Sequence, residues 1–273
     1  MSTVTSKDGT TIGFTRAGQG PAVILVDGAM GYRSGGLNGP LAERLRQHLT
    51  VYTYDRRGRG ESGNTLPFAP ERELEDLNAL IEHAGGSAAV YGISSGAALA
   101  LEAARHGLPI TRLALYEPPF IVDGTRAPVP DDYLARLDEL LAAGRRGDAI
   151  RLFMREGVGL PGIVVAMMRL MPAWSRLKGV AHTIPYDAAF VDAFQKGKPL
   201  PPGRWDLVTV PTLVMDGGKS HAWIRNAAQA LADALPKAEH RTLQGQTHVV
   251  KAAALAPMLT GFLTNAATVT PSA

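Results

Sequence analysis

The feature that most restricts the fold is a repeated alternation of short apolar runs with longer helical patterns. The run Ala22–Val26 (AVILV) is typical of a buried strand, whereas Glu71–His83 places its leucines at the spacing of one helix face. Strands that alternate with helices form parallel sheets with helices packed on both faces, because each parallel pair needs a crossover connection. The sequence therefore predicts an α/β protein.

The predicted elements give one core domain with an insertion. Strands are predicted at residues 10–14, 22–26, 51–54, 88–91, 112–116, 212–215 and 239–243, and helices at 41–49, 71–83, 95–106, 131–143, 148–156, 222–235 and 249–265. The alternation stops after Pro119 and resumes at Thr212, with helical patterns between them. We therefore expect a core domain built from residues 1–117 and 203–273, with a helical cap or lid, residues 118–202, inserted between two strands.

Composition and charge argue against several classes of protein. The 273 residues are 45% hydrophobic, as in ordinary globular chains, and the net charge of +3 is not gathered into runs, so no nucleic-acid partner is expected. The most apolar stretch, residues 157–171, is interrupted by Pro161 and Arg169 and is shorter than the roughly 20 residues of a membrane span, so no membrane partner is expected. The N-terminus lacks a secretory signal pattern, and we expect a cytoplasmic protein.

Residue types limit the available chemistry. The chain has no cysteine, which removes disulfides, thiolate metal sites and a cysteine nucleophile. The histidines are scattered rather than paired on one element, and the Gly-x-Gly strings lack the strand-to-helix context of a dinucleotide site. We therefore predict no metal and no cofactor, and any covalent chemistry must use oxygen or nitrogen.

A nucleophile motif lies between a predicted strand and a predicted helix. Gly92-Ile93-Ser94-Ser95-Gly96 matches G-x-S-x-G in the strand-turn-helix context that a nucleophile elbow requires. The flanking glycines permit a tight turn that lifts the Ser94 hydroxyl above the sheet edge, and the same turn presents the amide of Ser95. The alternative is a glycine-serine loop that merely joins the strand to the helix.

A serine nucleophile needs a neighbouring base. Of seven histidines, His248 follows the turn after the last predicted strand, so it should lie at the carboxyl edge of the sheet together with Ser94. We predict His248 as the base. The alternative is a loop histidine that caps the final helix.

By these motifs the chain resembles the α/β-hydrolases over nearly its whole length. Residues 55–62 (DRRGRGES) resemble the D-x-R-G-x-G-x-S loop of that family, and Asp27-Gly28-Ala29-Met30 occupies the place of its His-Gly oxyanion loop. The resemblance implies an α/β-hydrolase fold, with a mostly parallel central sheet, helices on both faces and an inserted helical cap. It also implies that the amides of Ser95 and of Gly28 or Ala29 form the oxyanion hole. Asp27 replaces the usual histidine, so its carboxylate must be turned away or hydrogen-bonded; Asp27 as a nucleophile is the outside alternative.

The acid departs from the usual pattern of that family. The loop after strand 212–215 reads Asp216-Gly217-Gly218-Lys219-Ser220-His221, with no carboxylate in the usual position. Some α/β-hydrolases use a position after the preceding strand, which is Glu117 here. We favour Glu117 as the acid and keep Asp216 as the alternative. Glu117 could instead be a structural carboxylate facing an arginine such as Arg112.

One subfamily shares this combination. The chain resembles the fungal zearalenone lactone hydrolases in Asp27-Gly28, the G-x-S-S-G elbow, Glu117-Pro118, and a cap tryptophan, Trp174, shortly before Thr183-Ile184-Pro185. The resemblance makes Trp174 a substrate contact. We add Met154, His182 and Tyr186 as candidate pocket residues because methionine and aromatic side chains suit an apolar acyl group. The alternative for these residues is a role in the core of the cap.

Together these features predict a serine hydrolase that cleaves a carboxylic ester or lactone through an acyl-enzyme on Ser94. Its partner would be a small-molecule substrate. The sequence leaves open whether the protein forms a homodimer. A non-catalytic ligand-binding or receptor-like homologue is the alternative from another class, motivated by Asp27 and the empty acid position. Haloperoxidase or carbon–carbon hydrolase chemistry at the same residues is a further alternative.

Overall fold

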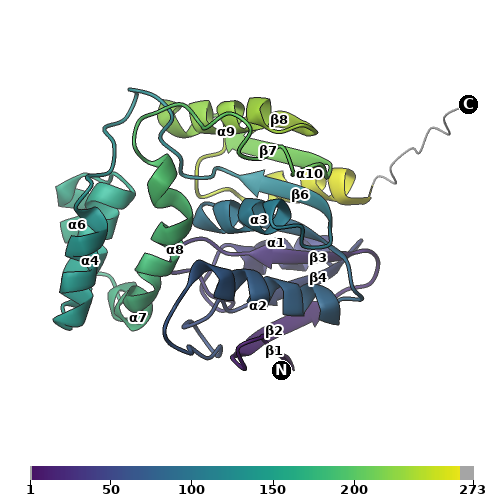
Figure 1. Ribbon diagram of the computed structural model, residues 1–273, viewed down its shortest axis with the longest axis horizontal. Coiled ribbons are helices and arrows are strands. Elements are labelled where there is room, and N and C mark those ends of the chain that lie inside the picture. The colour runs from purple at the N-terminus through teal and green to yellow at the C-terminus, as the bar shows by residue number, and fades with distance from the viewer. Residues whose placement is uncertain (1, 265–273) are drawn as a thin grey trace, which may run out of the picture.

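The centre of the molecule is one eight-stranded sheet (Figure 1). The computed structural model describes residues 2–264. The strands are β1 (Ser2–Thr5), β2 (Thr11–Ala17), β3 (Ala22–Val26), β4 (Thr50–Tyr54), β5 (Ala88–Ile93), β6 (Ile110–Tyr116), β7 (Thr212–Gly217) and β8 (Ala238–Leu243), in the order β1-β2-β4-β3-β5-β6-β7-β8. Strands β1 and β2 are antiparallel to their neighbours, and β3 to β8 run parallel. The carboxyl ends of the parallel strands therefore meet at one edge.

Helices cover both faces of the sheet. The helices outside the β6–β7 connection are α1 (Asn38–Leu45), α2 (Pro70–His83), α3 (Ser95–Arg105), α9 (Ala222–Ala234) and α10 (Ala252–Thr264). Side chains alternate across each strand, so Ile24 and Val26 join the cluster under α2, α3 and α9, while Val23 and Leu25 join the cluster under α1 and α10. The apolar runs seen in the sequence are apolar at every position because both faces of these strands are buried.

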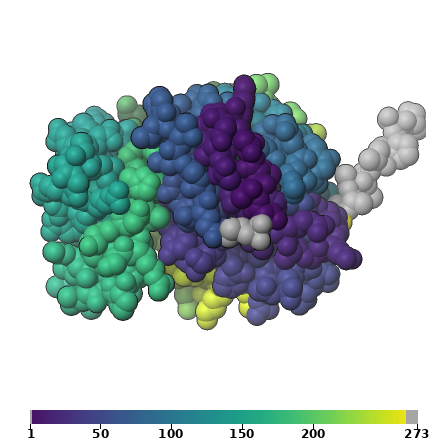
Figure 2. Space-filling view, turned by 90° about the horizontal axis from the view of Figure 1, so that it is seen from below, coloured from purple at the N-terminus to yellow at the C-terminus, as the bar shows by residue number. Residues whose placement is uncertain are grey.

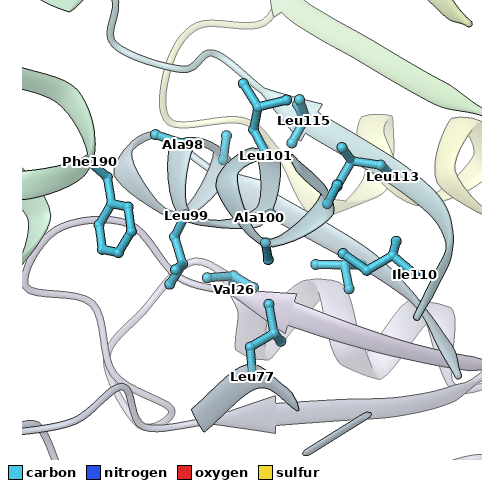
Figure 3. Close-up of a cluster of buried hydrophobic side chains, with 14 of the residues drawn as sticks. Val26, Leu77, Ala98, Leu99, Ala100, Leu101, Ile110, Leu113, Leu115 and Phe190 are labelled. Atoms are coloured by element: carbon cyan, nitrogen blue, oxygen red, sulfur yellow. The ribbon is translucent and has the colours of Figure 1, made fainter. Parts of the chain in front are cut away.

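The first cluster is built around helix α3. Leu99 lies close to Val26 of β3 and Leu77 of α2, while Leu101 lies near Leu113 and Leu115 of β6 (Figure 3). The alanines of α3 are buried, from Ala97 at 0% exposure to Ala104 at 7%. Small side chains let the helix pack closely on its neighbours, which explains why it is rich in alanine. A tightly buried α3 fixes the position of its first turn, which follows directly on Ser94.

Residues 117–211 connect β6 to β7, and we call them the helical insertion. They contain α4 (Tyr133–Ala142), α5 (Arg146–Leu152), the π-helix η1 (Phe153–Gly157), α6 (Gly162–Met168), α7 (Ala173–Val180), the 3₁₀ turn η2 (Ala181–Thr183), α8 (Ile184–Val191) and the 3₁₀ turn η3 (Asp192–Phe194). The insertion lies at one end of the sheet and forms a block beside the core (Figures 1 and 2). It has its own cluster of buried side chains, which also takes in Met30 from the core.

The structure confirms the α/β architecture and refines its details. Strand β1 was not predicted, because its four residues (STVT) are largely exposed and lack an apolar run. The predicted helix 148–156 is divided into α5 and η1. The predicted closing helix begins later, at Ala252, and its last predicted residue lies outside the described residues. Over residues 2–264, no helix is long and apolar enough to cross a bilayer.

Candidate active site

Ser94 stands on a sharp turn between β5 and α3. Its backbone has φ 58° and ψ −130°, a combination rarely adopted by residues other than glycine. A Cβ atom on Gly92 would lie 2.3 Å from the carbonyl oxygen of Gly96, and one on Gly96 would lie 2.5 Å from that of Val26. The two glycines of the motif are therefore required by close backbone packing, and the strained serine between them is partly exposed.

Glu117 occupies the corresponding position on the next strand. Ile93 pairs with Tyr116, so Ser94 and Glu117 each follow a paired residue, and the Ser94 amide donates to the carbonyl of Tyr116 at 2.9 Å. Glu117 is fully buried with φ 48°, which turns it out of the strand direction. Its Oε1 accepts a hydrogen bond from the amide of Gly217 at 2.7 Å. The backbone amide of β7 therefore fixes this carboxylate beside the elbow.

His248 meets the same carboxylate from the other side. Its Nδ1 lies 2.7 Å from Glu117 Oε2, while Tyr116 Oη donates to the carbonyl of Thr247 at 2.8 Å and anchors the loop. A carboxylate can only accept, so the imidazole donates from Nδ1 and a neutral ring keeps Nε2 free as a base. The His248 side chain is 41% exposed, in contrast to the buried Glu117. The ring is thus oriented by a buried carboxylate and open to a reactant.

Asp216, the other candidate acid, directly precedes Gly217 but pairs with a different histidine. Its Oδ2 is 2.6 Å from His240 Nε2, and both residues are on the strands β7 and β8 themselves. Strand alternation places Asp216 on the same face as Val214, which belongs to the cluster under α9. The carboxylate that contacts His248 is therefore Glu117, and Asp216 contacts another histidine.

The loop after β3 lies directly against Ser94. A Cβ atom on Gly28 would lie 3.0 Å from Ser94 Cβ and 3.6 Å from its Oγ, so a side chain here would press against the elbow. Ala29 follows, and Met30 has φ 58°. The amides of this loop and of Ser95 come from two different strand ends that flank the serine.

Asp27 is buried beneath this loop and packs against Gly36. A Cβ atom on Gly36 would lie 2.4 Å from Asp27 Oδ2, and backbone hydrogen bonds from Leu37 and Asn38 favour the charged carboxylate. Burial nevertheless raises the pKa of Asp27 to about 7, against the opposing effect of the buried arginines 56 and 59. The carboxyl group is thus held inside the loop by hydrogen bonds.

A sequence profile described as the alpha/beta hydrolase family matches residues 25–259. The chain belongs to this family. The crystal structure of an alpha/beta hydrolase from Sphaerobacter thermophilus DSM 20745 is 56% identical, covers 96% of this chain and 100% of its own, and superposes with a TM-score of 0.89. The fold class predicted from the sequence, an α/β-hydrolase fold with a mostly parallel sheet, is confirmed.

More distant solved structures share the fold. An enol-lactonase from Burkholderia xenovorans LB400 is 24% identical, with 97% of this chain and 100% of that chain covered and a TM-score of 0.68. A thermophilic esterase from Thermogutta terrifontis is 21% identical, with 95% of each chain covered and a TM-score of 0.63. At these identities the likeness concerns the arrangement of the chain.

The predicted pocket residues of this alpha/beta hydrolase fall into two groups. Met154 and Trp174 are half-buried and pack on the cluster of the insertion that includes Met30, two residues after Gly28. Tyr186 stacks on Phe68 at 3.8 Å and donates to Asn64, and His182 lies beside Gly58. The first group therefore packs on the buried cluster of the insertion, whereas the contacts of the second group run to the loop after β4.

His182 has an unusual environment within that second group. Burial lowers the pKa of its imidazole, with a further contribution from Arg146. Burial therefore disfavours the charged form of this imidazole. Among residues 2–264, no group of three His, Cys, Asp or Glu side chains is arranged to hold a metal ion.

Three residues next to the elbow were not singled out from the sequence. Asp187 of α8 contacts Arg56 and Arg59 at 2.5 Å each, and its Oδ1 accepts from Ser95 Oγ at 2.8 Å. All of these side chains are buried. The available signal was the loop DRRGRGES itself, since several arginines between a buried strand and a helix require buried carboxylate partners.

Proposed function

We propose that this member of the alpha/beta hydrolase family is a serine hydrolase that cleaves a carboxylic ester or lactone. Ser94 is the nucleophile, His248 the general base and Glu117 the acid that orients it. The observation that supports this most directly is the 2.7 Å contact between His248 Nδ1 and Glu117 Oε2. Glu117 directly follows β6, which pairs with the strand that leads into the serine elbow. A buried carboxylate, an oriented imidazole and a strained serine at one sheet edge are the parts of a nucleophilic triad.

The reaction follows from these positions. His248 Nε2 takes the hydroxyl proton as Ser94 Oγ bonds to the carbonyl carbon, and the carbonyl electron pair moves onto oxygen. Backbone amides of Ser95 and of Gly28 or Ala29 stabilise that oxyanion. The intermediate collapses with cleavage of the bond to the alcohol oxygen, which receives the proton from His248. Water then attacks the acyl-enzyme by the same route, and the acid and free Ser94 are released.

The apolar surroundings favour a substrate with an apolar or aromatic moiety. The cluster of the insertion includes Met30, two residues after Gly28, and Met154 and Trp174 pack on the same cluster, so a substrate group that enters the insertion would meet mainly apolar side chains. Solved structures of this fold include an enol-lactonase and an esterase, which is in keeping with an ester or lactone substrate. In a lactone, the leaving alcohol stays attached to the acyl chain and is released with it.

Replacement of Ser94 tests the function. Ser94→Ala should abolish turnover of p-nitrophenyl butyrate and labelling by a fluorophosphonate probe, because no other side chain replaces the nucleophile. Ser87→Ala is the matched control, since Ser87 is an exposed serine just before β5. Retained turnover in Ser94→Ala would refute the proposal. A wild-type protein that neither turns over esters nor reacts with the probe would favour the ligand-binding alternative.

The chain length of the acyl group tests the substrate class. We expect kcat/KM to rise from p-nitrophenyl acetate to longer or aromatic esters, and Trp174→Ala to reduce that preference with less effect on the acetate. A panel of lactones of increasing ring size, assayed by acid release, would then separate lactonase from esterase activity. A preference for acetate unchanged by Trp174→Ala would contradict the apolar pocket.

A further inference from the structure

A cluster of buried charges lies between the helical insertion and the oxyanion loop. Arg56 and Arg59 are 1% exposed and Asp187 is 2% exposed. Arg56 Nη1 donates to Asp187 Oδ1 and Arg59 Nη2 donates to Asp187 Oδ2, both at 2.5 Å. Glu73 binds the remaining edge of Arg56 at 2.6 and 2.8 Å. Buried guanidinium groups need such partners, because an unpaired charge in this environment is strongly destabilising.

The two arginines also hold the backbone of the loop after β3. Arg56 Nη1 donates to the carbonyl of Asp27 at 3.2 Å, and Arg59 Nη1 donates to the carbonyls of Gly28 at 2.8 Å and Gly31 at 3.3 Å. In a trans peptide the C=O and the N–H point in opposite directions. The peptide that carries the Asp27 carbonyl also carries the Gly28 amide, and the Gly28 carbonyl is paired in the same way with the Ala29 amide.

The arginines therefore set the direction of both candidate amides of this loop. With each carbonyl bound on the buried side, the Gly28 and Ala29 N–H groups point to the opposite side of the loop. Gly28 lies against Ser94, with 3.6 Å between its hypothetical Cβ and Ser94 Oγ. A guanidinium bound to a carbonyl also polarises the peptide and makes its N–H a stronger donor. Both effects favour an oxyanion next to Ser94.

The carboxylate of Asp187 also contacts Ser95, the residue that supplies the remaining candidate amide of the oxyanion hole. Ser95 Oγ donates to Asp187 Oδ1 at 2.8 Å, and the amide of Ser95 is the remaining candidate donor. Asp187 thus contacts the side chain of one donor residue directly and the peptides of the others through two arginines. It belongs to α8, within the insertion, and not to the strands that form the elbow.

We propose that Asp187 is a positioning residue that sets the geometry of the oxyanion hole from the helical insertion, through Arg56, Arg59 and the Ser95 hydroxyl. This rests on the proposed hydrolase function. The oxyanion exists only during the reaction, so the cluster acts mainly on kcat and has little effect on binding of the neutral substrate.

The chain offers a matched pair for comparison. Arg57 Nε and Nη2 donate to Asp76 at 2.8 and 2.7 Å, and Arg57 is as deeply buried as Arg59. Arg57 Nη2 also donates to a backbone carbonyl, at 3.2 Å, but this carbonyl belongs to Arg72 of α2 and not to the oxyanion loop. Asp76→Asn therefore disturbs an equally buried arginine–aspartate pair without touching the peptides that flank Ser94.

The experiment compares Asp187→Asn with Asp76→Asn in the full-length protein. Steady-state kinetics with p-nitrophenyl butyrate give kcat and KM, and a phenylboronic acid, whose tetrahedral adduct on Ser94 places an oxygen in the oxyanion hole, gives an inhibition constant. Loss of a single oxyanion donor typically costs about 100- to 1,000-fold in kcat. In Asp187→Asn the donor amides would be misoriented but still present, so we expect kcat to decrease by about 10- to 100-fold. Boronate affinity should fall in parallel, and KM should stay nearly unchanged.

Two milder variants keep the test decisive if Asp187→Asn does not fold. Ser95→Ala removes one hydroxyl and leaves both ion pairs, and Arg59→Lys keeps the charge but loses the planar fork that spans Gly28 and Asp187. Each should lower kcat and boronate affinity together by a smaller factor. Loss of thermal stability alone in these variants, with kcat and boronate affinity as in Asp76→Asn, would overturn the proposal. Failure of the hydrolase function is recognised separately, since the wild type would then not react with the fluorophosphonate.

Discussion

One carboxylate–imidazole pair lies just beyond the end of β6 and another lies on β7 and β8, and their contact distances are nearly identical. Glu117 and His248 are 2.7 Å apart, and Asp216 and His240 are 2.6 Å apart. They differ in where the backbone places them. Glu117 follows β6 with a positive φ and meets a loop histidine at the sheet edge, whereas Asp216 and His240 lie within strands and face a helix. Contact between an acid and a histidine is therefore common, and the position relative to Ser94 determines which pair can do chemistry.

The largest expected difference between the two pairs concerns the histidines. His248→Asn should lower kcat on the order of 10⁴- to 10⁶-fold, because the base that accepts the Ser94 proton is lost. His240→Asn, at the end of an equally short contact, should leave kcat near the wild-type value. Steady-state assays with p-nitrophenyl butyrate measure both. Similar losses in the two variants would mean that the two pairs are not functionally distinct.

The carboxylates give the next largest difference. Glu117→Gln keeps the shape but removes the charge that selects the Nδ1–H tautomer of His248, and we expect kcat to fall about 10³- to 10⁴-fold. Asp216→Asn should change kcat little and instead lower the free energy of unfolding by about 1 to 2 kcal/mol through the weakened contact with His240. Urea titration monitored by circular dichroism measures the stability. The reverse pattern of effects would make Asp216 the acid.

A third carboxyl group at the end of a strand, Asp27, extends the comparison to stability. Its pKa of about 7 in the folded protein exceeds the ordinary value of 3.8. A raised pKa gives stability that is complete below pH 4 and is lost as the pH rises through 7. Between pH 5 and pH 8 this group should remove about 2 to 3 kcal/mol from the free energy of unfolding.

Asp27→Asn checks this pH dependence. The variant has no carboxyl group to ionise, so its stability relative to wild type should increase by that amount from pH 5 to pH 8. Urea titrations at the two pH values give the difference. A constant difference between variant and wild type would show that Asp27 is already ionised at pH 5.

The smallest expected effect concerns Tyr116, whose hydroxyl holds the loop that carries His248 of the Glu117–His248 pair. Tyr116→Phe removes the hydroxyl that anchors the loop at Thr247, next to His248, and the aromatic ring stays in the core. A single hydrogen bond of this kind is worth about 0.5 to 1.5 kcal/mol, so we expect a decrease in kcat of a few fold and a small loss of stability. Measuring KM as well shows whether only the orientation of the histidine has changed.

The core of the fold could be predicted from the sequence because its strands are buried on both faces. The apolar run of β3 coincides with the predicted residues, and the other core strands differ from prediction by a few residues at their ends. Within the insertion, the short helices α6 to α8 were not predicted. Pro161, Pro172 and Pro185 lie at or beside their first residues, and seven or eight residues give too few turns for a periodic pattern.

The candidate site was predictable where local sequence determines it. The elbow at Ser94 depends on glycines two residues away, and the order of strands places His248 at the same edge. The choice between Glu117 and Asp216 stayed open, because it depends on which way each side chain leaves its strand. The role of Asp187 could not be inferred, since its contact with Arg56 joins residues 131 positions apart.

The link from Asp187 to both sides of the elbow restricts how this member of the alpha/beta hydrolase family can be re-engineered. Segments between β6 and β7 are attractive to exchange when a new substrate is wanted, because they are continuous in the chain. A transplanted segment that lacks an acidic side chain at this place would leave the buried Arg59 without its ion-pair partner and Arg56 with Glu73 alone. Graft designs should therefore retain this aspartate or replace its arginine partners at the same time.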